Sequence, residues 1–169
     1  MILFRTISKK FAAQWHQWDK TESFRKGARW NSAQTPVMYF SSNPQNAMLE
    51  TSNYYATPRL ANAVAVLCVF ECKSLAIRSI EPHELPSDWD SPLHQVSTQA
   101  LGDTILQGAD YDGILVPSVG IHPEVAAHPL NDVRQTSYAN VVINPLSARV
   151  KNMELIEILP PVFTQRMFA

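Results

Sequence analysis

The stretch GARWNSAQTPVMYFSSNPQNAMLE at residues 27–50 gathers an arginine, a tyrosine and a glutamate into one short unit. Arg29 lies in a glycine-led loop, and Tyr39 lies in an apolar run that is typical of a short strand. A Ser-Ser-Asn-Pro turn at 41–44 follows, and a polar cap before proline indicates the start of a helix. Glu50 lies on that predicted helix.

On this helix Glu50 shares a stripe with residues spaced three and four positions away. The stripe consists of Asn46, Ala47, Glu50 and Tyr54. A carboxylate on such a mixed stripe needs a partner or a function, because burying it unpaired is costly. One interpretation is a structural ion pair between Arg29 and Glu50, with Tyr39 in the core.

The other interpretation is a pocket for a ligand that is phosphorylated, aromatic and positively charged. Arg29 offers a planar donor fork for a phosphate. Tyr39 offers a flat face for a ring. Glu50 offers negative charge for a developing cation. The residues alone leave both interpretations open.

Composition limits the class of protein. The chain has 169 residues, of which 46% are hydrophobic and 17% charged, and its net charge is -1. This length fits one domain over residues 1–169. A near-neutral charge argues against direct nucleic-acid binding, and a weakly charged surface suits a partner. Without a membrane-length apolar run or the apolar core of a signal peptide, we expect a cytoplasmic protein.

Apolar runs predict most of the strands. They fall at 2–6, 37–41, 63–72, 74–80, 114–118, 140–145 and 153–159. The valine-rich run 63–72 reads as a central strand buried on both faces, and its Cys68 and Cys72 lie roughly 13 Å apart, too far for a disulfide.

Helical spacing predicts the remaining elements. Besides the Glu50 helix, helices are expected at 8–18 and at 93–107, the second with three residues facing inward: Val96, Ala100 and Ile105. Residues 81–92 read as a loop that Trp89 anchors. Few βαβ units occur, so we predict an α+β domain with a mixed or antiparallel sheet and flanking helices.

One loop carries residues that can bind metals. Residues 119–138 contain His122, His128 and Asp132. Their spacing does not match that of zinc-binding motifs such as HExxH or CxxC, so we expect no metal site. No P-loop and no glycine-rich dinucleotide fingerprint occurs either.

Several segments, in order, resemble the RES domain family, which is named after its Arg, Glu and Ser residues. The matching segments are Phe4-Arg5, Gly27-Ala28-Arg29-Trp30-Asn31, Tyr39 with Ser41, Ala47 with Glu50, Leu101-Gly102-Asp103, Val116-Pro117-Ser118, and the NVVINP sequence at 140–145. They extend over nearly the whole chain. The chain departs from the pattern at Ala28, where a glycine doublet is usual, and at Gln34, where glycine is common.

The resemblance implies a fold similar to that of ADP-ribosyltransferases and the destruction of NAD+, by hydrolysis or phosphorolysis of the nicotinamide–ribose bond. It assigns catalysis to Arg29, Tyr39 and Glu50. It assigns substrate binding to Arg5, Arg29, Tyr39, Ser41 and Ser118. Ser137 is a second candidate for the family serine, but Ser118 has the Val-Pro context. NAD+ would be the substrate, inorganic phosphate a co-substrate, and no cofactor or metal is implied.

The resemblance also implies a partner, an Xre-type helix-turn-helix antitoxin that covers the active site, and it leaves open a homodimer within that complex. Three functions follow for testing. The first is an NAD+-degrading toxin of a toxin–antitoxin pair. The second is an ADP-ribosyltransferase that modifies a protein or a nucleic acid. The third is a non-catalytic nucleotide-binding module.

Overall fold

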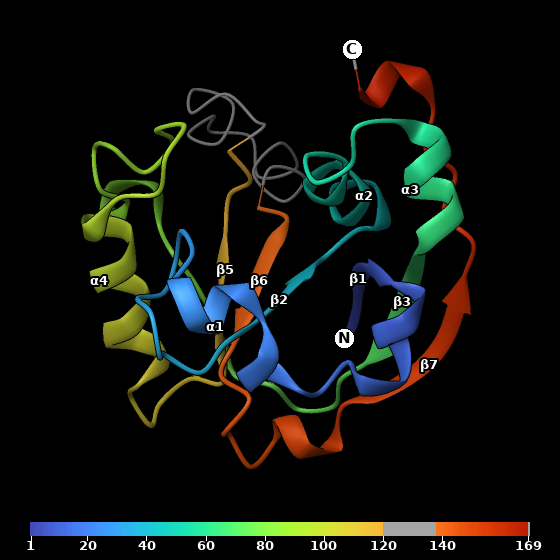
Figure 1. The fold of residues 1–169 in the computed structure, drawn as a ribbon. Helices are drawn as coiled ribbons and strands as arrows, with labels where there is room; N and C mark the ends of the chain where they lie inside the picture. Colours follow the sequence, from blue (N-terminus) through green and yellow to red (C-terminus); the bar gives the residue numbers. More distant parts are fainter. Residues whose placement is uncertain (120–137, 169) are drawn as a thin grey trace.

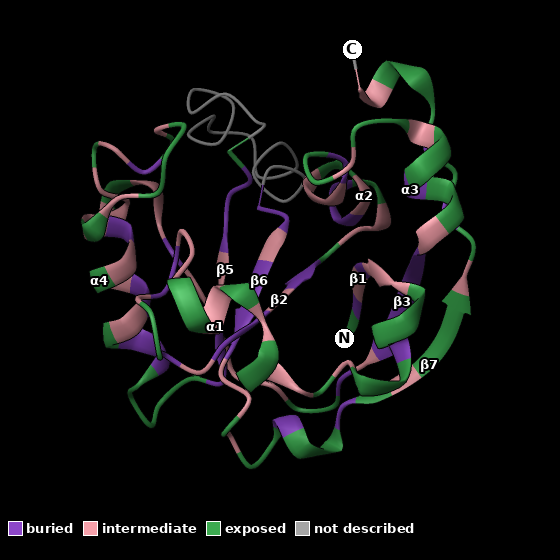
Figure 2. Cartoon of the chain, viewed as in Figure 1, coloured by how far each residue is buried: buried purple, intermediate pink, exposed green. Residues whose placement is uncertain are grey.

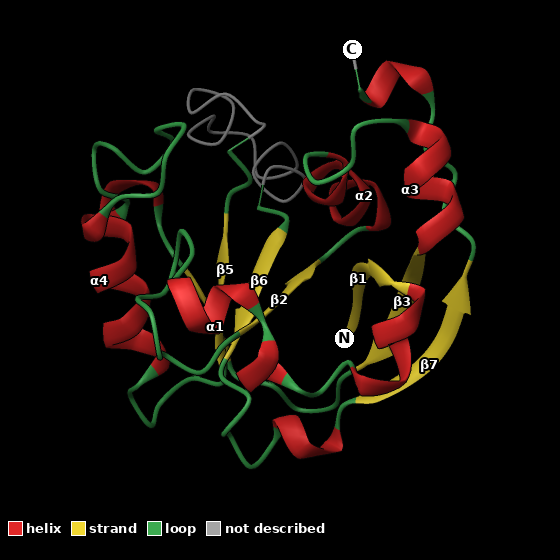
Figure 3. Cartoon of the chain, in the orientation of Figure 1, coloured by secondary structure: helices red, strands yellow, loops and turns green. Residues whose placement is uncertain are grey.

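One mixed sheet organises residues 1–119 and 138–168, the part of the chain that this computed structural model describes (Figures 1 and 3). Its strands are β1 (Ile2–Ser8), β2 (Met38–Ser41), β3 (Ala65–Glu71), β4 (Ile77–Ser79), β5 (Gly113–Val116), β6 (Asn140–Ile143) and β7 (Glu154–Leu159). The seven strands lie in the order β4-β5-β6-β2-β1-β3-β7. Only β4 and β5 are parallel neighbours. The α+β prediction with a mixed sheet is confirmed.

The sheet is nearly split between β1 and β2. These two strands share a single residue pair, Phe4 with Ser41. By contrast, β1 pairs with β3 along its whole length, and β2 pairs with β6 along its whole length. The sheet therefore has two parts, β4-β5-β6-β2 and β1-β3-β7, which diverge beyond that one pair (Figure 1).

Helices lie on both flanks of the sheet. They are α1 (Glu22–Lys26), α2 (Pro44–Ser52), α3 (Pro58–Val64) and α4 (Val96–Leu106). Short 3₁₀ turns complete the described elements: η1 (Lys9–Gln14), η2 (Trp18–Lys20), η3 (Pro82–Glu84), η4 (Val150–Asn152) and η5 (Gln165–Met167). Helix α2 contacts β1, β2 and β3, so it bridges the two parts of the sheet.

Two apolar clusters hold the sheet, and burial is densest along β3, β5 and β6, whereas β7 is mostly exposed (Figure 2). On one face Phe40, Phe70 and Cys68 pack with other apolar side chains; on the other, Trp30, Ile114 and Val142 do. Alternating strand residues point to opposite faces, which explains this division. Both cysteines, at 68 and 72, are free and buried, as predicted.

The prediction for the valine-rich run is only partly right. Residues 65–70 are buried, but β3 lies next to the edge of the sheet rather than in its centre. The run also begins inside α3, because Thr57 caps that helix and Pro58 opens it. Since α2 and α3 contact β3 from one side and η1 contacts it too, this strand is covered without a central position.

Two helix predictions need correction. The segment 8–18 forms two 3₁₀ turns, because Trp15 packs edge to face on Phe70 whereas Trp18 packs on Phe24, so the aromatic rings do not share one helix face. In α4, Ile105 is buried as predicted.

The other two inward assignments in α4 are wrong, because Val96 and Ala100 are exposed. The contact is made at Gly102, where an added Cβ would lie 1.9 Å from the carbonyl oxygen of Trp30. Glycine therefore sets the inward face of this helix, since only its missing side chain permits so close an approach.

Candidate active site

Glu50 lies on α2, and two residues, one just after β5 and one at the start of β6, donate hydrogen bonds to its carboxylate. Its Oε1 accepts hydrogen bonds from Ser118 Oγ at 3.0 Å and from Asn140 Nδ2 at 3.1 Å. Ser118 follows β5, and Asn140 opens β6. The side chain of Asn43 caps α2 by accepting from the Asn46 amide at 2.8 Å, as the polar-cap pattern predicts. The cap and the two donors fix the position of the carboxylate.

A pair of asparagines orients the amide that holds Glu50. Asn46 Nδ2 donates to Asn140 Oδ1 at 2.7 Å and to Ser41 Oγ at 3.0 Å. Because the oxygen of Asn140 is engaged in this way, its NH₂ group faces Glu50. Sequence reasoning gave neither asparagine a role, since neutral amides carry no charge or spacing signal.

Arg29 does not pair with Glu50. Its guanidinium donates to the backbone carbonyls of Trp89 at 2.6 Å and Ser91 at 2.8 Å, and thereby ties the loop at 81–92 to the site. Burial lowers the pKa of Arg29, and the nearby charge of Glu50 partly offsets this effect. The two side chains are thus close enough to interact through space, but within the described residues they form no ion pair. The structural ion pair is therefore wrong.

Tyr39 is anchored by its hydroxyl. This group accepts from the Trp30 amide at 3.1 Å and donates to Asn31 Oδ1 at 2.8 Å. Burial raises the pKa of the Tyr39 phenol above its ordinary value, and its ring is partly buried against the Trp30 cluster. Tyr39 therefore serves the core and also lies near Arg29, because the Arg29 charge acts on its phenol.

The loop that carries Arg29 is fixed from α4. Asp103 accepts from the Ser32 amide at 3.1 and 3.3 Å, and Gly102 meets the Trp30 backbone. At the end of this loop Gln34 has φ of +70°, in the left-handed region that favours glycine. Gln34 stands where the RES family commonly has glycine. Its left-handed backbone shows that this departure bears on the shape of the loop, as expected from the sequence.

The predicted residues thus fall into two places. Arg29, Tyr39, Glu50 and Ser118 lie close together: Ser118 is bonded to Glu50, and the Arg29 charge interacts with both Glu50 and Tyr39. Ser41 is buried behind them and accepts from an asparagine.

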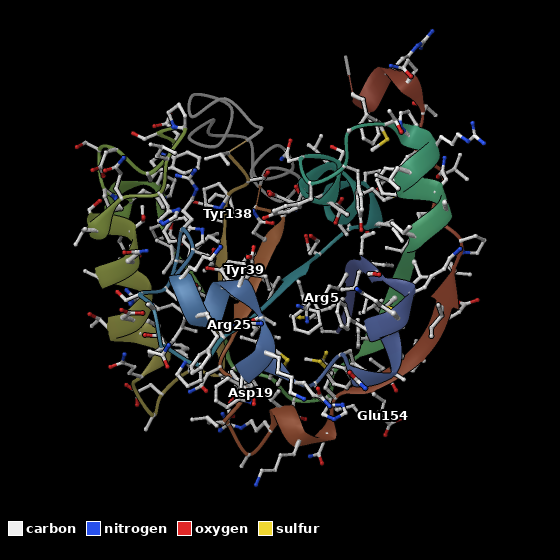
Figure 4. All side chains as sticks on the ribbon, viewed as in Figure 1. Arg5, Asp19, Arg25, Tyr39, Tyr138 and Glu154 are labelled. Carbon is white, nitrogen blue, oxygen red and sulfur yellow. The ribbon has the colours of Figure 1, made fainter. Side chains whose placement is uncertain are left out.

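Arg5 lies elsewhere, on β1, where its guanidinium carbon is 5.7 Å from the centroid of the Phe40 ring. It faces the opposite side of the sheet from Tyr39, because Arg5 and Phe40 both contribute to the face that carries Cys68. Figure 4 shows Arg5 apart from Tyr39.

The alternative serine and the candidate metal ligands cannot be placed. Ser137, His122, His128 and Asp132 lie outside the described residues. Within residues 1–119 and 138–168, no three His, Cys, Asp or Glu side chains gather as metal ligands would. Over the same residues, no helix combines the length and the apolar character that crossing a membrane requires.

Comparison with known proteins gives a family match. The RES domain model matches residues 2–155. A protein named Toxin Res from Photorhabdus laumondii is 24% identical over 147 residues, which cover 87% of this chain and 83% of the relative. A second protein of that name, from Yersinia enterocolitica, is 26% identical over 149 residues, covering 87% of this chain and 95% of the relative.

Proposed function

Since the chain belongs to the RES domain family, we propose that it is a toxin that cleaves the nicotinamide–ribose bond of NAD+. Two relatives named Toxin Res support the biological role. The observation that carries the chemistry is the Glu50 carboxylate, held by Ser118 and Asn140 and, within the described residues, not neutralised by an ion pair. Its charge remains available for a substrate.

The reaction needs such a charge. When the bond between ribose C1′ and the nicotinamide nitrogen breaks, its electron pair leaves with nicotinamide, and the ribose acquires oxocarbenium character. A fixed carboxylate stabilises that developing cation without having to reorganise. Water or phosphate then adds to C1′; addition of water releases a proton. We propose both acceptors for this site.

The flanking residues fit the rest of the substrate. Two of the N–H groups of Arg29 are engaged by carbonyls, and the others, which have no partner among the described residues, can donate to the pyrophosphate. The partly buried ring of Tyr39, held by its hydroxyl, offers a face to the cationic nicotinamide. Ser118 is a positioning residue, because its hydroxyl is bound to Glu50 and no histidine base contacts it in the described structure.

A partner is part of the proposal. Large apolar side chains are exposed around Glu50: Leu49 and Tyr54 on and after α2, and Val119 next to Ser118. Such exposure suits a covering surface. We propose that an Xre-type antitoxin binds over this rim in the cytoplasm, with a homodimer of the toxin left open. No cofactor is required by this chemistry.

The test follows both halves of the substrate. Purified chain, free of antitoxin, is incubated with NAD+ labelled in the adenosine half, and nicotinamide and the labelled product are measured with and without phosphate. We expect nicotinamide release with a small labelled product, and none from Glu50→Gln. Label on a macromolecule would instead establish an ADP-ribosyltransferase. Bound but uncleaved NAD+ would establish a binding module, and either result contradicts the proposal.

A further inference from the structure

The divergence of β1 from β2 opens a cavity of about 510 Å³ that the site around Glu50 does not use. Its walls come from the second half of β1, from η1, from the segment of η2 and α1, and from the end of α2. This volume lies in the range of small-molecule sites in proteins. Figure 4 shows two of the lining cations, Arg5 and Arg25, on either side of the space between the two parts of the fold.

Arg5 is the inner cation of this cavity, and the protein satisfies it poorly. Its one hydrogen bond goes to the Trp15 carbonyl at 3.4 Å, which is long, and Phe40 supplies a ring contact. Within the described residues no carboxylate pairs with it. Burial lowers the pKa of this guanidinium. A desolvated cation without a counter-charge is costly, so the site suits an anion.

The other two cations that line this cavity, Lys20 and Arg25, are exposed to solvent. Arg25 donates to the Lys20 backbone carbonyl and is exposed. Glu22 on the same rim pairs with Lys26 at 3.0 Å, on the protein surface. A bound anion would therefore be drawn inward to Arg5, and the rim would contribute only screened, long-range attraction.

Four aromatic side chains are among the remaining lining residues. Trp15, directly after η1, lines the cavity, and Phe11, Tyr54 and Tyr55 line it as well. Phe11 is 52% exposed and Tyr54 is 81% exposed, so each leaves apolar ring surface uncovered. Aromatic side chains stack on the flat face of a nucleotide base, whichever base it is. The combination of one partly buried cation and several aromatic rings is that of a site for a base joined to a phosphate.

The cavity adjoins the end of the helix that carries Glu50. Thr51, the next residue along α2, lines it; its hydroxyl donates to the Ala47 carbonyl at 2.9 Å and also lies 3.4 Å from the Thr6 carbonyl on β1. Tyr54 lines it too. Partial desolvation raises the pKa of the Tyr54 phenol, and the Glu50 charge adds to this shift, so Tyr54 stands between the two places.

We propose that this cavity binds the adenosine 5′-phosphate half of the dinucleotide, with Arg5 on the phosphate and an aromatic wall on the adenine. The inference rests on the proposed function only for the identity of the complete substrate. Nicotinamide and its ribose then lie at Glu50, and the pyrophosphate passes between Arg5 and Arg29. This assignment gives Arg5 a role although its strand places it on the other face of the sheet.

The test uses AMP, which has no nicotinamide bond and can be measured on the unaltered chain by calorimetry. Adenosine and inorganic phosphate are the other probes. We expect AMP to bind, adenosine to bind more weakly, and phosphate to compete only weakly. Arg5→Met should weaken AMP binding at least tenfold, because a charge-assisted hydrogen bond is lost. Tyr54→Ser should weaken it about fivefold or more through lost stacking.

Stability separates a ligand contact from a structural one. Replacing an unpaired, desolvated cation with an apolar side chain of similar length is neutral or stabilising, so Arg5→Met should melt at the same temperature as the unaltered chain or higher. Arg59→Met is the matched control, because Arg59 is exposed on α3 away from the cavity lining, and it should leave AMP affinity unchanged. Tyr54→Ser alters an exposed side chain and keeps the test informative if Arg5→Met fails to fold.

The outcomes distinguish this inference from the proposed function. Unchanged AMP affinity in Arg5→Met and Tyr54→Ser overturns the cavity assignment even if nicotinamide is released. Phosphate binding as tightly as AMP, with no binding of adenosine, also overturns it. AMP binding lost in Arg5→Met supports the assignment even if NAD+ is not cleaved, and in that case only the proposed function fails.

Discussion

Two carboxylates in this chain have similar local partners but different fates. Glu50 accepts from Ser118 and from an asparagine amide. Asp112 accepts from Ser147 Oγ, from the Ala76 amide at 2.6 Å and from Arg149 Nη1 at 3.0 Å. Each carboxylate therefore accepts one hydrogen bond from a serine hydroxyl and one from a neutral N–H group. Only Asp112 is also in direct contact with a cation; Arg29 acts on Glu50 through space without forming an ion pair.

The additional cation decides what each group does. Burial alone would raise the pKa of Asp112, but its hydrogen bonds and the Arg149 charge together lower it below the ordinary value. Asp112 therefore links the start of β5 to β4 and to the segment after β6. Its negative charge is paired with Arg149 within the fold. Neutral donors hold Glu50 in place without an ion pair, so its charge stays available to a cationic transition state.

The largest expected effect comes from neutralising Glu50. Glu50→Gln keeps the size of the side chain but removes the charge that faces the ribose. We expect nicotinamide release to fall by about 10²–10³-fold or more, with a melting temperature close to that of the unaltered chain. Release assays and thermal melts on the same preparation check this. A variant that loses its fold would mean that Glu50 is structural like Asp112, and the contrast between the two would disappear.

Asp112→Asn should show the reverse pattern. We expect a loss of about 2 kcal/mol in unfolding free energy at pH 7, because charge-assisted hydrogen bonds weaken, and little change in activity per folded molecule. Since the folded-state pKa of Asp112 is lowered, its contribution is present above the unfolded pKa and is lost as the pH falls through the folded pKa. Urea melts should therefore show the difference from wild type shrinking below about pH 4. A constant difference between pH 7 and pH 3 would contradict this account.

Asn140→Asp tests whether neutrality of the donor matters. The change places a second carboxyl group against Glu50, and like charges at this range favour protonation of one of the pair. We expect the acidic limb of the pH–rate profile to move to higher pH, with a loss of activity of roughly tenfold at pH 7. Asn46→Leu, which removes the amide that donates to Asn140 and to Ser41, should lower kcat without adding a charge. Profiles of the same shape in both variants would show that Asn140 acts only in packing.

Much of the sheet could be predicted because buried strands leave an apolar signature. The run at 63–72 and the NVVINP segment identify β3 and β6 directly. Short helices are harder to detect: α1 has only Thr21 as its cap signal, and α3 merges into the valine run despite its Thr57-Pro58 start. The inward face of α4 was misjudged because a glycine, which adds nothing to an apolar pattern, makes the closest contact.

The site could be predicted only in its charged members. Arg29 and Glu50 are visible in sequence because charged groups on apolar elements need an explanation. Asn46 and Asn140 are ordinary polar residues far apart in the chain, and their bond exists only once β6 lies beside the start of α2. The cavity at Arg5 depends on the near-split between β1 and β2, which no local sequence pattern encodes.

The smallest effect should come from Arg149→Gln, which removes the one feature that separates the two carboxylates. The Arg149 side chain is 52% exposed, whereas Asp112 is nearly enclosed, so solvent screens the pair and Ser147 with the Ala76 amide still hold the acid. We expect a loss of about 1 kcal/mol or less, reduced further at high salt. Nicotinamide release should not change. If the loss instead approached that of Asp112→Asn, the cation itself rather than the neutral donors would hold Asp112, and neutral donors alone would be a weak basis for fixing Glu50.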